Sequence, residues 1–146
     1  MIPLFGLMIG VFCLLPKAAE TYHDQLQNGC QNLNDAAFKD WGHRAFLYAI
    51  ITRIAGYGYN LEYSCTRENE AADFDNGGPA TVPPKGVFMD YVPENWTTYA
   101  DGPYDDYDFL LDAGMMMGQI LKEKPHDLTT IGCSYERWKK AYCVAF

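Results

Sequence analysis

Four cysteines that follow an apolar leader constrain this chain more than any other feature. The first fifteen residues, MIPLFGLMIGVFCLL, are uncharged and have the length of a secretory signal core rather than of a membrane span. We expect cleavage at Ala18 or Ala19, so residues 1–19 are predicted to be a signal peptide that takes Cys13 with it. In an oxidising compartment, the remaining cysteines are expected to form disulfides. These are Cys30, Cys65, Cys133 and Cys143.

The pairing of these cysteines stays open, because four cysteines permit three connectivities. A direct bridge between Cys133 and Cys143 is one of the possibilities. An even set of cysteines in a secreted chain favours structural disulfides over a catalytic or redox thiol. We therefore predict that all four are structural.

The chain of 146 residues carries a formal net charge of −8. Residues 20–146 are enough for one domain, and we predict a single one. Nucleic acid and anionic lipid are poor partners for such a chain, because phosphate binding needs clustered Lys and Arg. We expect no nucleic-acid partner, and no membrane insertion once the signal is removed.

Apolar residues that recur at spacings of three and four predict helices. The first helix is expected to begin near Ala36, with Asn34 or Asp35 as its cap, and to end at Gly56. The second is LEYSCTRENEAADF, in which Glu68 interrupts the apolar side. The acidic residues of this helix are expected to form a solvated face.

A third helix is expected after a cap at Asp105 or Asp106, with the MMM run predicted to fill the core. GVFMDYV, TTIGCSY and KKAYCVAF read as strands, and the ERW between the last two is too long for a tight hairpin and too short for a crossover helix. The predicted fold is α+β, an α/β/α sandwich with a short antiparallel sheet between helices. The buried side of the third helix is predicted to contain Leu110, Ala113, Met117 and Leu121.

Several motifs occur in this same order. HRAFLYAIITRIAG follows Cys30, and LEYSCTRENEAA supplies Tyr63, Cys65 and Glu68. PENW and then TTIGC come further along the chain. This pattern resembles the CAP superfamily of SCP-like extracellular proteins, which includes cysteine-rich secretory proteins, antigen 5 and pathogenesis-related proteins. The likeness is nearest to the activation-associated secreted proteins of parasitic nematodes.

The resemblance implies a cavity in which two histidines and two acidic residues can hold a divalent metal. In this chain Ile50 stands at the first histidine position and Gln119 at the second, while Glu94 and Asp112 remain. Isoleucine offers no ligand atom and an amide binds metal weakly, whereas imidazole is a strong zinc ligand. We therefore expect a degenerate cavity, with no metal and no cofactor.

Other candidate sites are weak. The histidines His23, His43 and His126 lack the spacing of a metal motif. Glu94 and Asp112 could act as an acid and base pair, but acidic residues are abundant in this chain.

Two surface features could be functional. Asn95 begins an Asn-Trp-Thr sequon and is a candidate for glycosylation, or for partial burial if the cavity persists. The segment from Tyr99 to Asp112 mixes tyrosine and aspartate, which is typical of a loop before a capped helix or of a patch for a basic partner. Asp105, Asp106 and Asp108 are the candidate contacts in that patch.

The sequence thus predicts a secreted, non-enzymatic protein that works by binding, and the resemblance implies an extracellular role with a protein or lipid ligand. The resemblance implies a role at a host and parasite interface, as an antigen or immunomodulatory effector. The first alternative is a tyrosine-rich structural protein of a secreted matrix, since the chain has 11 tyrosines. The second is a small secreted hydrolase that uses Glu94 and Asp112.

Overall fold

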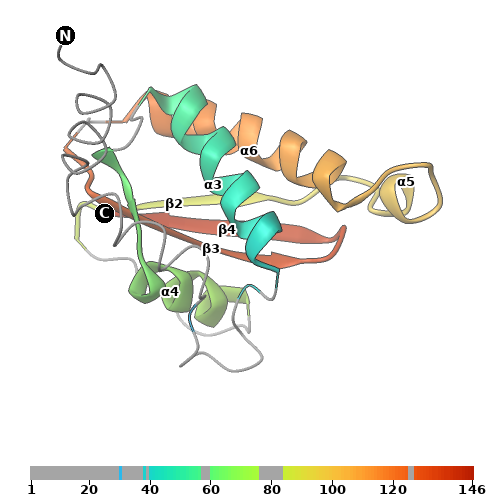
Figure 1. Cartoon of the computed structure of the whole chain (residues 1–146), viewed down its shortest axis with the longest axis horizontal. Coiled ribbons are helices and arrows are strands. Elements are labelled where there is room, and N and C mark those ends of the chain that lie inside the picture. The colour runs from blue at the N-terminus through green and yellow to red at the C-terminus, as the bar shows by residue number, and fades with distance from the viewer. Residues whose placement is uncertain (1–29, 31–37, 39, 57–59, 76–83, 125–126) are drawn as a thin grey trace, which may run out of the picture.

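The computed structural model describes residues 30, 38, 40–56, 60–75, 84–124 and 127–146. In this part of the chain, helices cover both faces of a four-stranded sheet, so the α+β class is confirmed. The helices α3 (Trp41–Ala55) and α6 (Asp106–Lys122) lie on one face, and α4 (Cys65–Asp75) lies on the other (Figure 1). None of the helices in the described ranges has the length and apolar character to cross a membrane. The predicted signal, residues 1–19, lies outside the described residues.

The sheet has the strand order β1-β3-β4-β2. Strand β4 (Lys140–Ala145) pairs antiparallel with β3 (Thr130–Glu136) and with β2 (Val87–Tyr91). These are the three strands that the sequence predicts. The two-residue strand β1 (Glu62–Tyr63) adds a parallel edge beside β3, so the complete sheet is mixed.

Strands β3 and β4 are joined by a hairpin with a three-residue loop. This corrects the expectation that ERW is too long for a tight hairpin. Strand β3 continues to Glu136, which pairs with Lys140. The turn is closed by Trp138, which has a φ of 59°. A residue in the left-handed region is usual in three-residue hairpin loops, although Gly commonly occupies it.

Helix α3 begins five residues later than predicted, at Trp41 rather than near Ala36. Asp40 has extended backbone, and its carboxylate accepts a hydrogen bond from the His43 N–H at 3.1 Å, so Asp40 is the N-cap. Asn34 and Asp35 lie outside the described residues. The helix ends as predicted at Gly56, whose φ of 79° suits glycine.

Helix α4 begins at Cys65, because the residues before it pair with β3 instead of continuing the helix. The prediction of a solvated acidic face is wrong for Glu68, whose exposed fraction is 0%. A buried carboxylate needs partners that replace water, and these are described below.

Helix α6 follows its prediction closely. Asp105 is the N-cap and forms a capping box with Asp108, in which each side chain accepts a hydrogen bond from the backbone N–H of the other residue. The four residues predicted for its buried side are all buried. The MMM run fills the core only through Met117, because Met115 and Met116 are 49% and 52% exposed.

Close packing of α6 on α3 depends on two glycines. A Cβ atom at Gly118 would lie 2.6 Å from the Cβ of Ile54, and one at Gly114 would lie 2.7 Å from the Cγ2 of Ile50. Real Cβ atoms do not approach carbon so closely. The two glycines therefore let isoleucine side chains of α3 fit against the backbone of α6.

Two disulfides connect the four predicted cysteines. Cys30 is bonded to Cys65 at the start of α4, and Cys133 is bonded to Cys143 across the central strands. Cys133 and Cys143 are directly opposite in the register of β3 and β4, and both are buried. One disulfide therefore fixes α4 to an earlier segment, and the other holds together the two strands at the centre of the sheet.

Strand β3 approaches the backbone of α4 closely at Gly132. A Cβ atom there would lie 2.0 Å from the backbone N of Glu68 and 2.5 Å from the carbonyl O of Ser64. Backbone atoms cannot move aside as a flexible side chain can. Gly132 therefore sets how closely the first turn of α4 packs on the sheet.

We predict that Gly132→Ala lowers the free energy of unfolding by about 3 kcal/mol or more, because the added methyl group forces α4 away from the sheet. Urea denaturation followed by circular dichroism measures this. Gly56→Ala is the matched control, since a Cβ there meets nothing within 4 Å. Its cost should be about 1 kcal/mol, from the positive φ alone. Equal losses in the two variants would contradict the steric explanation.

Candidate functional site

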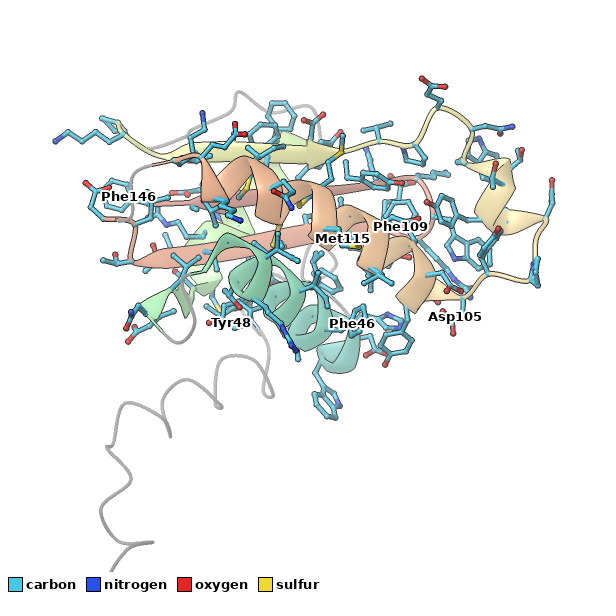
Figure 2. All side chains as sticks on the ribbon, turned by 90° about the horizontal axis from the view of Figure 1, so that it is seen from above. Phe46, Tyr48, Asp105, Phe109, Met115 and Phe146 are labelled. Carbon is cyan, nitrogen blue, oxygen red and sulfur yellow. A yellow bond between two sulfur atoms is a disulfide. The ribbon has the colours of Figure 1, made fainter. Side chains whose placement is uncertain are left out.

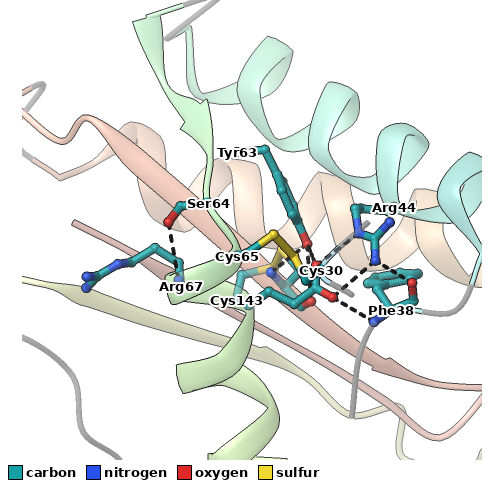
Figure 3. A network of polar contacts seen from close by, with 10 residues as sticks. Cys30, Phe38, Arg44, Tyr63, Ser64, Cys65, Arg67 and Cys143 are labelled. Carbon is teal, nitrogen blue, oxygen red and sulfur yellow. Dashed lines mark hydrogen bonds and ion pairs between the residues drawn. A yellow bond between two sulfur atoms is a disulfide. The ribbon is translucent and has the colours of Figure 1, made fainter. Parts of the chain in front are cut away.

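A buried charged cluster is centred on Glu68 of α4. Its carboxylate accepts hydrogen bonds from the Phe38 N–H at 2.7 Å, from Arg44 Nε at 2.9 Å and from Arg44 Nη2 at 3.1 Å. The Tyr63 hydroxyl donates a fourth hydrogen bond to Oε2 (Figure 3). A carboxylate has about four lone-pair positions, so these donors satisfy it completely.

Arg44 reaches this cluster from the opposite helical layer. It lies on the buried side of α3, is 2% exposed, and also donates from Nη2 to the Phe38 carbonyl. The rings of Phe38 and Tyr63 lie 5.7 and 5.9 Å from its guanidinium carbon. Burial alone would lower the pKa of Arg44, but its hydrogen bond to Glu68 and the negative charge nearby raise the pKa, so the guanidinium stays charged.

Tyr63 completes the cluster at the edge of the sheet. Strand β1 ends there, and the last backbone hydrogen bond between this segment and β3 runs from the Ser64 N–H to the Ile131 carbonyl. The next N–H of β3, that of Cys133, donates instead to the Tyr63 hydroxyl at 3.2 Å. Burial, and then the negative charge of Glu68, raise the pKa of Tyr63 well above its usual value. Its hydroxyl therefore remains a donor at any physiological pH.

This cluster is structural in its chemistry. All acceptor positions of Glu68 are occupied by the protein, and its carboxylate is fully buried. The sequence analysis does not predict the pairing of Arg44 with Glu68, although the sequence contains a signal for it. Arg44, Leu47, Tyr48 and Ile51 share one side of α3, and a charge on an apolar side requires a partner.

The four residues predicted to be remnants of a metal cavity lie in different environments. Ile50 packs at the contact between α3 and Gly114, whereas Glu94 and Gln119 are exposed. Asp112 is also exposed and accepts a hydrogen bond from the Tyr99 hydroxyl at 2.6 Å. The structure thus assigns Ile50 a packing role and Asp112 a structural hydrogen bond.

His43 is the predicted candidate histidine that lies within the described ranges. Its ring is partly buried, with the Tyr107 ring 5.0 Å away, and its Nδ1 is 4.0 Å from Asp40. His23 and His126 lie outside the described residues. Among the described residues, no group of three or more His, Cys, Asp and Glu side chains could hold a metal ion.

Asn95 lies in an exposed turn before the short helix α5 (Thr97–Ala100). Its side-chain oxygen accepts hydrogen bonds from the Thr97 N–H at 3.1 Å and from the Thr97 hydroxyl. Of the two alternatives for this asparagine, the structure supports exposure. Glycosylation of Asn95 stays a prediction.

The segment from Tyr99 to Asp112 is only partly available as a binding patch. Tyr99 is 8% exposed, and its hydroxyl lies 2.8 Å from that of Tyr91. Burial, and then its hydrogen bond to Asp112, raise the pKa of Tyr99. Asp106 accepts a hydrogen bond from the Tyr135 hydroxyl at 2.7 Å and pairs with Arg137 at 3.1 Å. The predicted contact at Asp106 is therefore already occupied by the hairpin.

One side of α6 carries a row of partly exposed apolar residues at intervals of four. The first of them, Tyr107, packs edge-on against the rings of His43 and Phe46 on α3, with ring centroids 5.0 and 5.1 Å away. Tyr107, Leu111 and Met115 are 43%, 39% and 49% exposed. Figure 2 shows this helix beside α3, with Asp105 at its start and Met115 in its second half. Exposed carboxylates accompany the row, and we name the whole set the α6 surface. It comprises Tyr107, Leu111 and Met115 with Asp105, Asp108 and Asp112.

Comparison with known proteins returns no similarity: the chain matches no family model, no curated protein and no solved structure.

We predict that Arg44→Met lowers the free energy of unfolding by about 3–5 kcal/mol, because it leaves the Glu68 carboxylate buried without its cation. Arg53→Met is the matched control, since Arg53 is an exposed arginine in the last turn of the same helix. Its effect should stay within about 0.5 kcal/mol. Adding Glu68→Gln to Arg44→Met should cost less than the sum of the single losses. Additive losses would show that the two side chains are not coupled.

We also predict that stability falls above about pH 10. The pKa values of Tyr63, Tyr99 and Tyr135 are raised by folding, so the unfolded chain releases these protons first. Each such tyrosine lowers the free energy of unfolding by about 1.4 kcal/mol per pH unit in that range. Urea titrations at successive pH values measure the slope.

Tyr63→Phe should make the fall in the free energy of unfolding with pH less steep, by the contribution of one tyrosine. Tyr104→Phe is the control, because Tyr104 is 46% exposed, and it should leave the slope unchanged. An identical slope in both variants would mean that the Tyr63 hydroxyl is not held in its protonated form by the fold.

Proposed function

We propose that this chain is a secreted, non-enzymatic binding protein whose partner docks on the α6 surface. The observation that carries the proposal is the exposed row of Tyr107, Leu111 and Met115, on a helix that buries other apolar residues, such as Leu110 and Met117, against the core. Covering such a row removes apolar area from water, at about 25 cal/mol per Å². Contiguous exposed apolar side chains mark interaction sites on soluble proteins.

A protein partner fits this surface better than a lipid. Lipid carriage relies on an enclosed apolar cavity, whereas the row lies along the outside of a helix. Tyrosine and methionine are also common at protein interfaces, where they supply contact area and adapt to the partner.

The state of the acidic residues supports a role without catalysis. Glu68, the buried carboxylate, has all its acceptor positions filled, and Asp112 is exposed and bonded to Tyr99. Glu94 is exposed as well. A general acid and base usually work in a cleft that excludes water, so the Glu94 and Asp112 pair is weak support for a hydrolase.

Secretion is supported by the two disulfides, since such bonds persist mainly in oxidising compartments. It is supported independently by the apolar leader of residues 1–19. The proposal therefore includes cleavage of this leader and an extracellular site of action.

We extend the proposal to a divergent CAP-type protein that works at a host and parasite interface. The described elements occur in the order that the resemblance implies, with TTIGC at the start of β3 and both Cys65 and Glu68 on α4. Ile50 and Gln119, at the two histidine positions, favour a form without metal.

The structural-matrix alternative has less support. Cross-linking of tyrosines requires exposed rings, but Tyr48, Tyr63 and Tyr99 are buried, and their hydroxyls take part in hydrogen bonds. Tyr104 and Tyr107 are exposed enough to react. Material that contained dityrosine after secretion would favour this alternative over a soluble binding protein.

We predict that Leu111→Gln combined with Met115→Gln leaves the melting temperature unchanged within about 2 °C. Glutamine keeps the helix propensity, and side chains retained for binding contribute little to the stability of the free protein. Leu110→Gln is the control on the buried side of the same helix and should unfold the protein at a much lower temperature. A large loss in the double variant would show that the row is part of the core, and would remove the basis of the proposed function.

A further inference from the structure

We propose that the partner of the α6 surface is a basic, amphipathic helical segment of another protein. This inference rests on the proposed function and adds the chemistry and shape of the ligand. Two features carry it: the apolar row and the carboxylates placed beside it.

The shape of the surface suits a helix. Residues four positions apart lie one above another on a helix, about 6 Å apart along the axis, so Tyr107, Leu111 and Met115 form a ridge about 12 Å long. Ridges formed by residues four apart pack into the grooves of a second helix. A helix that presents apolar residues at similar intervals can therefore lie along α6 and cover the row.

The charge of the surface selects the sign of the partner. Asp108 and Asp112 each follow an apolar residue of the row by one position, which places them about 100° further round the helix as a parallel acidic row. Asp105 adds a third exposed carboxylate at the start of the helix. Asp106 does not contribute, because Arg137 pairs with it.

These charges exclude the other occupants of an apolar ridge. In a pairing of two copies of this chain through this surface, acidic rows would lie close to each other, and a net charge of −8 adds to the repulsion. Anionic membranes and nucleic acid are repelled for the same reason. Lysine or arginine residues on either side of a partner's apolar stripe would instead pair with the carboxylates and speed association.

Three isosteric changes test the charge without disturbing the fold. Asparagine is as good an N-cap as aspartate, and its side-chain oxygen still accepts a hydrogen bond. Asp105→Asn, Asp108→Asn and Asp112→Asn therefore keep the capping box and the acceptor for Tyr99 while they remove three charges. Charge reversal would instead remove the capping box at the start of α6 and the acceptor for Tyr99.

The probe is a synthetic amphipathic helix of leucine and lysine, about 18 residues or five turns long, with a fluorescent label. We expect the oxidised protein to bind it in low-salt buffer, with an affinity that falls as salt is added. The triple asparagine variant and the Leu111→Gln and Met115→Gln variant should each bind at least tenfold more weakly. Val92→Gln is the control, because Val92 is an exposed apolar residue outside α6, and it should bind as the parent does.

Two further probes separate the alternatives. A leucine and glutamate peptide with the same pattern should not bind, and neither should phosphatidylcholine vesicles. No binding of the leucine and lysine peptide, or equal binding by the triple asparagine variant, would overturn the inference about the partner. The proposed function would still stand in that case, because its own test is the stability of the Leu111→Gln and Met115→Gln variant. Binding to the vesicles would replace the protein partner by a lipid surface.

Discussion

The ion pair between Arg44 and Glu68 is the interaction on which the rest of the described fold depends. Arg44 comes from the α3 layer and Glu68 from the α4 layer, so the pair joins the helices on the two faces of the sheet. The two side chains can meet only where the sheet between the two helical layers is narrow. Because β1 is two residues long, the edge of β3 beyond it is left for the Tyr63 hydroxyl, which bonds both Cys133 and Glu68.

Burying two charges costs more than an apolar contact of the same size, so the pair is better explained by position than by net stabilisation. Each buried charge is compensated only if the other lies within hydrogen-bond distance. Any shift of α3 relative to α4 therefore raises the free energy of the folded state. Gly132 brings the first turn of α4 against β3, and the Cys30–Cys65 disulfide holds its first residue. These three constraints act on the same turn and together fix where Glu68 lies.

Local patterns in the sequence were enough to predict the three longer helices and strands β2, β3 and β4, but not β1, α5 or this junction. The cap at Asp105, the end of α3 at Gly56 and strands β2, β3 and β4 follow from propensities within a few residues. The start of α4 depended instead on pairing with β3, about seventy residues later, which no local pattern reports. For the candidate site, the sequence indicated the acidic aromatic segment, but it could not show that Tyr99 is buried or that Arg137 neutralises Asp106.

The acidic residues show why the difference between local pattern and tertiary contact matters for function. The sequence presents them as an excess of negative charge, whereas the structure assigns them different uses. Glu68 balances a buried cation and Asp106 an exposed one. Charge that is consumed in this way cannot attract a partner. The carboxylates along α6 are different, because their structural tasks require only an oxygen that accepts a hydrogen bond, which asparagine also offers. Their negative charge is therefore in excess of what the fold needs, and it lies beside an apolar row that the fold covers only in part.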